Sequence, residues 1–271
     1  PTTFIFFIME RKRILFVGLE EQEVNNIRQQ LGYEYLTVHY DMLPNAKLEN
    51  GTLFVESDSV PGKYLSVDKV VFHGIFEKDY DFLTLLSLWD GPCLPNATGM
   101  MDLRMRIPGL ARALKVSKYG GIKRSMVIGQ QDWESEKEVV AKWGIWHCGE
   151  DKHKFSGSWQ SNETSVIEEF IEGEAVRIMI IGDRYWQIRL TGEGWLKSIH
   201  NEGSWEMDID PELLADGIAI SKHFKLSTVG IDYMIGNDGN RYILEVNHIP
   251  NVTVFPFINE VFIDDTTKWI Q

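Results

Sequence analysis

Three oxygen-bearing side chains lie in or beside two neighbouring apolar segments near the end of the chain. Asp232 lies in the first segment, and Glu245 and Asn247 lie in and just after the second. The pair Asp238-Gly239 separates the segments and predicts a β-hairpin with a two-residue type I′ turn. In that register Asp232 faces Glu245, and Asn247 shares their face of the sheet.

Two carboxylates that face each other across apolar strands repel, and this repulsion destabilises a sheet. A divalent cation between them turns the repulsion into coordination, and the added amide oxygen gives a ligand set that suits Mg²⁺. Because Mg²⁺ takes few protein ligands and completes its shell with phosphate and water, the set indicates a nucleotide. The alternative is that Asp232 and Glu245 bind arginine side chains or backbone groups in an ordinary sheet.

The composition restricts the class of protein. A chain of 271 residues with 44% hydrophobic content can form two or three compact lobes. The net charge of −13 argues against a nucleic-acid partner and against an anionic membrane. Cys93 and Cys148 lie far apart, which predicts no disulfide framework and favours the cytoplasm. No apolar run approaches the roughly 18–20 residues that span a bilayer.

The first 95 residues alternate apolar strands with amphipathic helices, which predicts a small doubly wound α/β lobe. We expect buried strands at 13–19, 35–40 and 70–76, an edge strand at 53–55, and helices at 21–31 and 81–89. No Gly-x-Gly-x-x-Gly follows the first strand, so we expect a scaffold lobe rather than a dinucleotide site.

In the central region, residues 96–166, a helix is expected at about 100–114, interrupted by Pro108 and Gly109. Lys142 lies in an apolar strand, and a buried ammonium needs an anionic partner. The alternative is a lysine that protects an edge strand.

The segment that follows Lys142, residues 144–154, has the glycine content and the positive charge, from Lys152, of a flap over phosphates. His147, Cys148 and His153 have no fourth ligand at structural-zinc spacing, so no zinc site is expected.

The last region, residues 167–271, carries signals for a hairpin and for two helices. Gly182-Asp183 predicts a tight turn between strands that hold Arg177 and Arg189. These arginines are candidates for binding phosphate or a carboxylate substrate, or else surface ion-pair partners. Asp210-Pro211 predicts a helix N-terminus, and a closing helix is expected at 259–269.

The order of these features resembles the ATP-grasp superfamily, which includes ribosomal-protein glutamate ligases, glutathione synthetases and D-alanine–D-alanine ligases. The resemblance is carried by the strand Lys142, by the run Glu168-Glu169-Phe170-Ile171, and by Asp232 with Leu244-Glu245-Val246-Asn247 and Pro250. It implies an ATP-grasp fold, in which an N-terminal lobe (1–95) precedes two lobes (96–166 and 167–271) that sandwich ATP.

The resemblance also implies site residues. Asp232, Glu245 and Asn247 would hold one or two Mg²⁺ ions. Residues Arg106, Lys142, Lys152, Glu168, Glu169, Phe170, Ile171 and Glu174 would bind ATP, with adenine at the backbone of 168–171 and ribose at Glu174. Arg106 replaces the lysine usual at that place; guanidinium can bind phosphate, or the side chain is simply solvated. Residues Lys197, His200 and Asn201 would meet substrate, and Lys142, Arg177 and Arg189 would be catalytic.

The implied activity is an ADP-forming, ATP-dependent carboxylate–amine ligase that acts through an acyl phosphate. Its partners would be a small-molecule or peptide carboxylate and an amine, in the cytoplasm, and a homodimer is compatible with it. Two alternatives are a nucleotide-binding module without turnover and a ligase that modifies peptide or protein tails.

Overall fold

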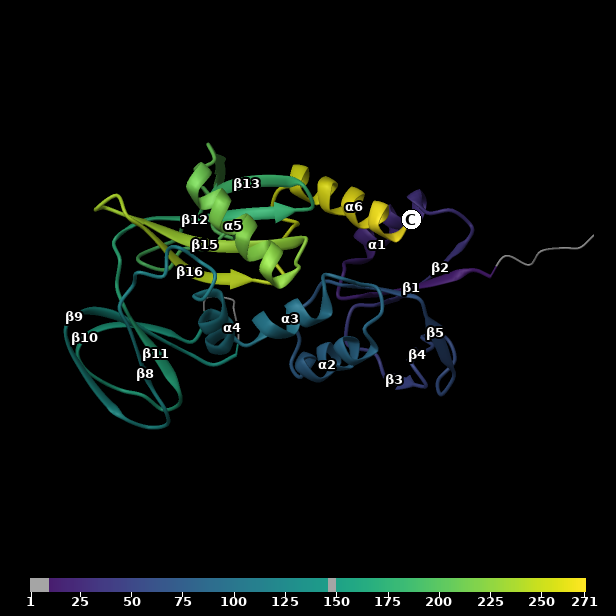
Figure 1. Cartoon of the computed structure of the whole chain (residues 1–271), viewed down its shortest axis with the longest axis horizontal. Coiled ribbons are helices and arrows are strands. Elements are labelled where there is room, and N and C mark those ends of the chain that lie inside the picture. Colours follow the sequence, from purple (N-terminus) through teal and green to yellow (C-terminus); the bar gives the residue numbers. More distant parts are fainter. Residues whose placement is uncertain (1–9, 146–149) are drawn as a thin grey trace, which may run out of the picture. The chain divides into compact units, whose positions relative to one another are not determined.

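The computed structural model describes residues 10–145 and 150–271. The chain divides into two compact units, residues 1–98 with 256–271 and residues 99–255. Each unit combines sheets with helices (Figure 1), and the predicted α/β class is confirmed. The division into three lobes at residues 95 and 166 stays a prediction.

The first unit is built on a parallel sheet, as the alternation of strands and helices predicted. Its strand order is β2-β1-β6-β7, with all neighbouring pairs parallel. The predicted third strand is shorter than expected and ends at Phe72. The elements of this sheet are β1 (Lys12–Val17), β2 (Tyr35–Tyr40), β6 (Lys69–Phe72), β7 (Cys93–Leu94), α1 (Glu21–Gln30) and α2 (Asp79–Trp89).

The carboxyl ends of β1 and β6 form the place where doubly wound sheets usually bind ligands. Here Gly18 and Gly74 lie against each other, and a Cβ atom added to either would collide with the ring of Phe76. The ring of Phe76 therefore lies at the carboxyl ends of these strands, and the expectation that this is a scaffold lobe stays a prediction.

A second, antiparallel sheet of this unit contains β3 (Ala46–Glu49), β4 (Thr52–Glu56) and β5 (Tyr64–Val67) in the order β3-β4-β5. The expectation of an edge strand at 53–55 is therefore wrong, because β4 lies in the middle. The reason is a type I′ hairpin at Asn50-Gly51, whose φ angles are 51° and 77°. This dipeptide is a strong hairpin signal in the sequence.

The closing helix α6 (Pro256–Ile270) packs against α1 in the first unit. It begins three residues before the predicted start. Asn259 Nδ2 on α6 donates a 2.9 Å hydrogen bond to Glu23 Oε1 on α1. Burial raises the pKa of Glu23 even though this hydrogen bond lowers it.

The helix expected at 100–114 is two helices, α3 (Ala97–Arg104), which begins two residues before the second unit, and α4 (Arg106–Ala113). The break lies at Met105, which is extended (φ −90°, ψ 122°), and not at Pro108 and Gly109. Pro108 is the third residue of α4, where its missing N–H would have no partner inside the helix. The predicted interruption is therefore wrong in position.

Two antiparallel sheets make up most of the second unit. The smaller sheet has the order β10-β9-β11-β8, and the larger has the order β14-β13-β12-β15-β16 (Figure 1). The predicted hairpin over Gly182-Asp183 is confirmed, because Ile181 pairs with Arg184. The strands are β8 (Arg124–Val127), β9 (Asp132–Trp143), β10 (Lys152–Gln160), β11 (Ser165–Glu169), β12 (Gly173–Ile181), β13 (Arg184–Arg189), β14 (Trp205–Met207), β15 (Thr228–Gly236) and β16 (Arg241–Asn247).

Helix α5 (Pro211–Phe224) starts where the sequence predicted. The Asp210 carboxylate accepts hydrogen bonds from the backbone N–H groups of Glu212 and Leu213, and Pro211 is the first helical residue. Arg241 Nε also donates to Asp210 Oδ2 at 2.6 Å, which ties the helix start to β16.

We expect Asp210→Ala to lower the free energy of unfolding by about 1–2 kcal/mol at neutral pH. Burial raises the pKa of Asp210, but the hydrogen bonds from Arg241 and the helix backbone outweigh it and lower the pKa. A carboxyl with a lowered pKa stabilises the fold above its ordinary pKa and loses that effect as pH falls. In urea unfolding the difference from wild type should therefore shrink below about pH 4. Asp208→Ala, at an exposed neighbouring acid, is the matched control.

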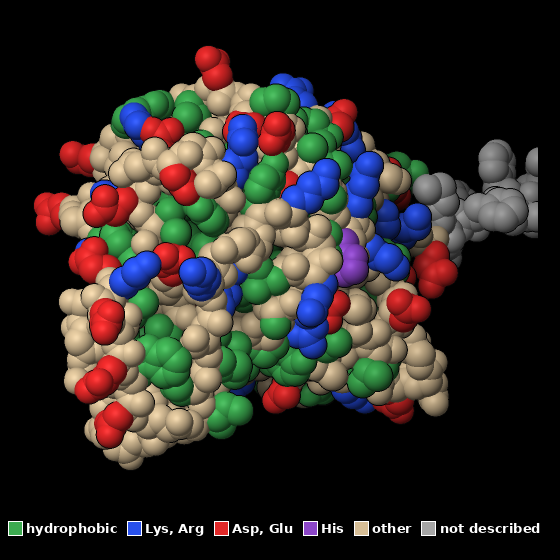
Figure 2. Space-filling view, turned by 60° about the vertical axis from the view of Figure 1, so that its left-hand side comes forward, with side chains coloured by type: hydrophobic (Ala, Val, Ile, Leu, Met, Phe, Trp, Pro, Cys, Tyr) green, Lys and Arg blue, Asp and Glu red, His purple; other side chains and the backbone are tan. Residues whose placement is uncertain are grey.

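No helix in the described ranges is both long and apolar enough to cross a membrane. Acidic side chains line much of the left-hand margin of the face shown in Figure 2, as a net charge of −13 leads one to expect.

Candidate functional site

The acidic pair lies on the hairpin of β15 and β16. Asp232 is the register partner of Glu245, and Gly230 is the partner of Asn247, so the predicted pairing of the two acids is confirmed. All three polar residues are buried, with exposed fractions of 7% for Asp232, 9% for Glu245 and 8% for Asn247.

The turn of this hairpin differs from the predicted two-residue type I′ turn. Gly236 N donates to Asn240 O at 2.8 Å, so the loop has three residues, 237–239, and of these only Gly239 has a positive φ, 81°. A bulge at Leu244 then adds one residue to β16 between the partners of Tyr233 and Asp232. The longer loop and the bulge shift the register in opposite directions, and the acids still face each other.

Asp232 forms an ion pair with an arginine from the adjacent strand. Arg177, its register partner on β12, donates from Nε to Oδ1 at 2.6 Å and from Nη2 to Oδ2 at 2.9 Å. Asn247 Nδ2 donates to the same Oδ2 at 3.2 Å. Burial lowers the pKa of Arg177, but Asp232 outweighs it and raises the pKa above its ordinary value. This is the arginine pairing that the sequence left open as an alternative.

Glu245 is approached by a lysine from the smaller sheet. Lys152 Nζ, at the start of β10, lies 3.5 Å from Glu245 Oε2, and both side chains are mostly buried. Arg177 and Lys152 therefore place one positive charge beside each acid. Within residues 10–145 and 150–271, no group of three His, Cys, Asp or Glu side chains could hold a metal ion. A site here would depend on Asn247 as its third ligand.

Lys142 has the anionic partner that its apolar strand required. Its Nζ lies 2.5 Å from Glu168 Oε2 on β11, and Arg124 Nε donates to Glu168 Oε1 at 2.8 Å. Glu168 is almost completely buried. Burial raises the pKa of Glu168, but the charges of Lys142 and Arg124 and their hydrogen bonds outweigh it, and the pKa is lowered. Glu168 is thus an ionised carboxylate that orients two cations.

The backbone expected to meet adenine, residues 168–171, includes the end of β11 and the two residues after it. Glu169 N donates to Lys123 O at 3.1 Å, and Phe170 N donates to Glu138 O at 3.1 Å. Ile171 lies between β11 and β12 and is half-buried. Of the two Phe170 backbone groups, the N–H is thus already used within the smaller sheet, and the carbonyl is the group left to consider for a ligand.

Side chains around Phe170 form an aromatic and cationic wall. Lys154 Nζ lies 4.3 Å from the centroid of the Phe170 ring, and Trp195 meets that ring edge-on at 6.3 Å.

Glu174, the expected ribose ligand, forms an ion pair with Arg189 on the neighbouring strand. Arg189 also lies over the ring of Trp205 at 4.8 Å.

Arg106, the expected phosphate ligand on the helix, donates from Nη1 to Trp143 O at 2.6 Å and to Asp151 O at 3.3 Å. It therefore holds the two ends of the β9–β10 connection. Residues 146–149 of the expected flap, with His147 and Cys148, lie outside the described residues. His153 stacks on Phe155 at 5.8 Å between ring centroids.

The expected substrate residues lie in the loop between β13 and β14. Lys197 Nζ donates to the carbonyls of Gly192 and Gly194, at 3.2 Å and 2.7 Å, so this cation folds back on its own loop. His200 and Asn201 are exposed. Their assignment to substrate binding stays a prediction.

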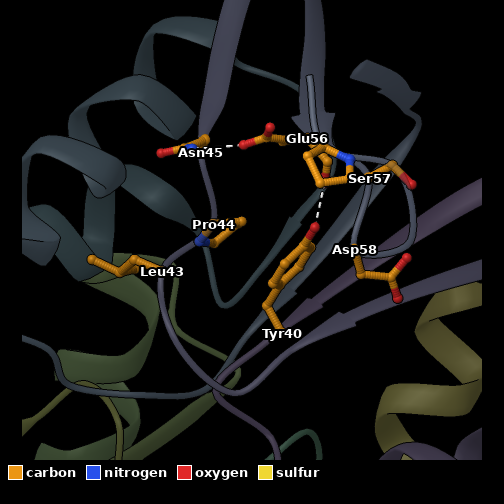
Figure 3. Close-up of a pocket in the computed structure, with 8 residues that line it drawn as sticks. Tyr40, Leu43, Pro44, Asn45, Glu56, Ser57 and Asp58 are labelled. Atoms are coloured by element: carbon orange, nitrogen blue, oxygen red, sulfur yellow. Dashed lines mark hydrogen bonds between the residues drawn. The ribbon is translucent and has the colours of Figure 1, made fainter. Parts of the chain in front are cut away.

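A pocket of about 340 Å³ lies in the first unit at the end of β2 (Figure 3). Tyr40, Asn45 and Glu56 line it, with Leu43, Pro44, Ser57, Asp58 and Pro61. Glu56 already accepts hydrogen bonds from Asn45 Nδ2 and from Gly62 N, both at 2.6 Å. Its carboxylate thus holds the walls of the pocket together.

Sequence reasoning missed Arg124 and Lys154. Arg124 is the first residue of the short strand β8, and only the structure places it beside Glu168. Lys154 is two residues from Lys152, and period-2 alternation could have placed both on the face that carries Lys142.

Comparison with known proteins identifies the fold. No protein-family model matches the sequence, and no curated protein matches it. D-alanyl-alanine synthetase A from Vibrio cholerae O1 biovar eltor matches with a TM-score of 0.65 and 14% identity, over 97% of this chain and 99% of that chain. The ATP-grasp ligase PsnB, complexed with a phosphomimetic variant of a minimal precursor, Mg and ADP, gives 0.60 and 13%, over 96% and 99%.

The chain has the ATP-grasp fold. A third protein with the ATP-grasp fold is a Chryseobacterium gregarium RiPP-associated ligase in complex with ADP and a leader and core peptide. It matches with a TM-score of 0.58 and 11% identity, over 93% of this chain and 96% of that chain. The predicted ATP-grasp fold is therefore confirmed over nearly the whole chain.

Proposed function

We propose that the protein is an ATP-dependent ligase that joins a carboxylate to an amine and releases ADP and phosphate. The observation that carries this proposal is the acidic pair of Asp232 and Glu245, buried on an ATP-grasp fold and approached by Lys152 from the smaller sheet. Lys152 Nζ, a cation that suits phosphate, thereby lies 3.5 Å from Glu245, one of the two acids that suit Mg²⁺.

The residues present fit Mg²⁺. Asp232 and Glu245 supply carboxylate oxygens, and Asn247, whose Nδ2 donates to Asp232, has its amide oxygen left as a ligand atom. When bound, Mg²⁺ would neutralise phosphate charge. Arg177 would hold the plane of the Asp232 carboxylate, and Lys152 would exchange Glu245 for a phosphate oxygen.

The proposed reaction proceeds in two steps. An oxygen of the carboxylate substrate attacks the γ-phosphorus of ATP, and the bond to the bridging oxygen breaks as ADP leaves. The amine nitrogen then attacks the acyl carbon, loses a proton, and expels phosphate that carries one oxygen of the former carboxylate. Lys142, oriented by Glu168, would offset the phosphate charge in the first step. The catalytic assignments of Arg177 and Arg189 stay predictions.

The substrate class is proposed from the similar structures. The Chryseobacterium protein binds a leader and core peptide, and the acidic surface of this chain suits substrates without net negative charge. We therefore propose that peptides supply the carboxylate, with small-molecule carboxylates as the alternative. The cytoplasmic location and the homodimer stay expectations.

A nucleotide-binding protein without turnover is the second candidate, favoured by the Arg177 ion pair that already neutralises Asp232. The test is ADP release from ATP and Mg²⁺ in the presence of a panel of amino acids and peptides. Carboxylates labelled with ¹⁸O should transfer one label to the released phosphate. AMPPNP binding without any ADP release across the panel would support the second candidate, and no binding would contradict both.

A further inference from the structure

One guanidinium group connects the smaller sheet, the larger sheet and the segment between α4 and β8. Arg124 Nε donates to Glu168 Oε1 at 2.8 Å, and Nη2 donates to Ile243 O on β16 at 3.0 Å. Nη1 donates to Gly120 O at 3.2 Å and to Ile122 O at 3.3 Å. The side chain is 13% exposed, so these hydrogen bonds are largely shielded from water.

The bond to Ile243 acts beside the β-bulge. Ile243 directly precedes Leu244, the bulge residue, and Glu245 follows. The N–H of Ile243 donates to Tyr119 O at 2.9 Å, while its C=O accepts from Arg124. Both backbone groups of Ile243 are therefore held, one by Tyr119 and the other by Arg124. These bonds fix the backbone position from which the Glu245 side chain extends.

That segment is itself held in place by a buried carboxylate. Asp216 on α5 accepts from Ser117 Oγ at 2.8 Å, from Lys118 N at 2.7 Å and from Tyr233 OH at 2.8 Å. The segment that carries the carbonyls around Arg124 is thus connected through Asp216 to Tyr233 of the larger sheet.

The other bond of Arg124 acts on the candidate phosphate lysine. Glu168 accepts from Arg124 with one oxygen and contacts Lys142 with the other. Movement of Arg124 would therefore change the position of Lys142 as well as that of Glu245. A guanidinium suits this role because its planar fork carries donors on three separate nitrogens, whereas a lysine carries all its donors on one nitrogen.

We propose that Arg124 is a positioning residue that couples nucleotide binding to metal binding, by fixing Lys142 and Glu245 relative to each other. This inference rests on the proposed function. Arg124 itself touches neither the phosphates nor the metal in this proposal. Its effect passes through Glu168 on one side and through the carbonyl of Ile243 on the other.

The test measures the affinity for AMPPNP, by calorimetry, without Mg²⁺ and with saturating Mg²⁺. The ratio of the two dissociation constants reports the coupling. In Arg124→Lys we expect this ratio to fall about tenfold, because a single ammonium cannot reach both acceptors. A purely structural effect would weaken both affinities alike and leave the ratio unchanged. Arg112→Lys is the matched control, since Arg112 is 48% exposed, with its Nε 3.6 Å from Asp102 Oδ1 and its Nη1 donating to Asp102 O at 3.2 Å.

A ratio within twofold of wild type in a folded Arg124→Lys protein would overturn the inference and leave the proposed function standing. If wild type binds no AMPPNP, the proposed function fails, and this inference fails with it. If Arg124→Lys does not fold, Glu168→Gln replaces it: this nearly isosteric change keeps an acceptor for Arg124 but removes the charge. It should also lower the ratio, and an unchanged ratio there would equally contradict the coupling.

Discussion

Glu245→Gln is expected to lower ATP turnover about 10²–10³-fold while the chain stays folded. Glutamine has the shape of glutamate but lacks the negative charge that Mg²⁺ requires beside Asp232. The change also removes a repulsion between facing acids and an ion pair with Lys152, which act in opposite directions on stability. We therefore expect the free energy of unfolding to change by less than about 1 kcal/mol.

The measurements are ADP release with the best substrate pair and AMPPNP binding at several Mg²⁺ concentrations. Glu206→Gln, at an exposed acid on β14 of the same sheet, should behave as wild type. A Glu245→Gln protein that keeps its Mg²⁺-dependent turnover would remove the acidic pair from the site.

Lys142→Met is the second change with a large expected effect. It leaves the buried carboxylate of Glu168 with Arg124 as its remaining cationic partner, which should cost about 3 kcal/mol of stability. Nucleotide affinity should fall as well, because the proposed phosphate ligand is lost. Lys47→Met, which breaks an exposed pair with Glu49, should change little.

The double change Lys142→Met with Glu168→Gln separates these two effects. Glutamine removes the uncompensated charge, so stability should recover in thermal or urea unfolding. The affinity for AMPPNP should stay low, because no cation returns to that place. Recovery of affinity together with stability would mean that Lys142 only balances Glu168.

Much of the second unit could be predicted from short signals. Asp210-Pro211 gave the start of α5, and Gly182-Asp183 gave the β12–β13 turn, because each needs only local chemistry. The pairing of Asp232 with Glu245 was predicted correctly from a turn that does not form. A three-residue loop and a bulge at Leu244 produce the same pairing, and spacing alone cannot distinguish the two geometries.

Long-range partners could not be predicted from the sequence. Nothing near Arg124 indicates that its acceptors are 44 and 119 residues away, on Glu168 and Ile243. The same holds for Arg177: the sequence placed it on a strand, but only the order of strands sets it beside Asp232. The break at Met105 was placed wrongly for another reason. Pro108 indicated an interruption of the helix, but a proline in the first turn of a helix does not interrupt it.

The ring of Phe76, packed over Gly18 and Gly74, also matters for redesign. It occupies the crevice that other doubly wound sheets leave open for a small molecule. A smaller residue at this one position would leave a cavity at the carboxyl ends of β1 and β6, within the first unit. The first unit is therefore a convenient starting point for engineering a small-molecule site into this chain.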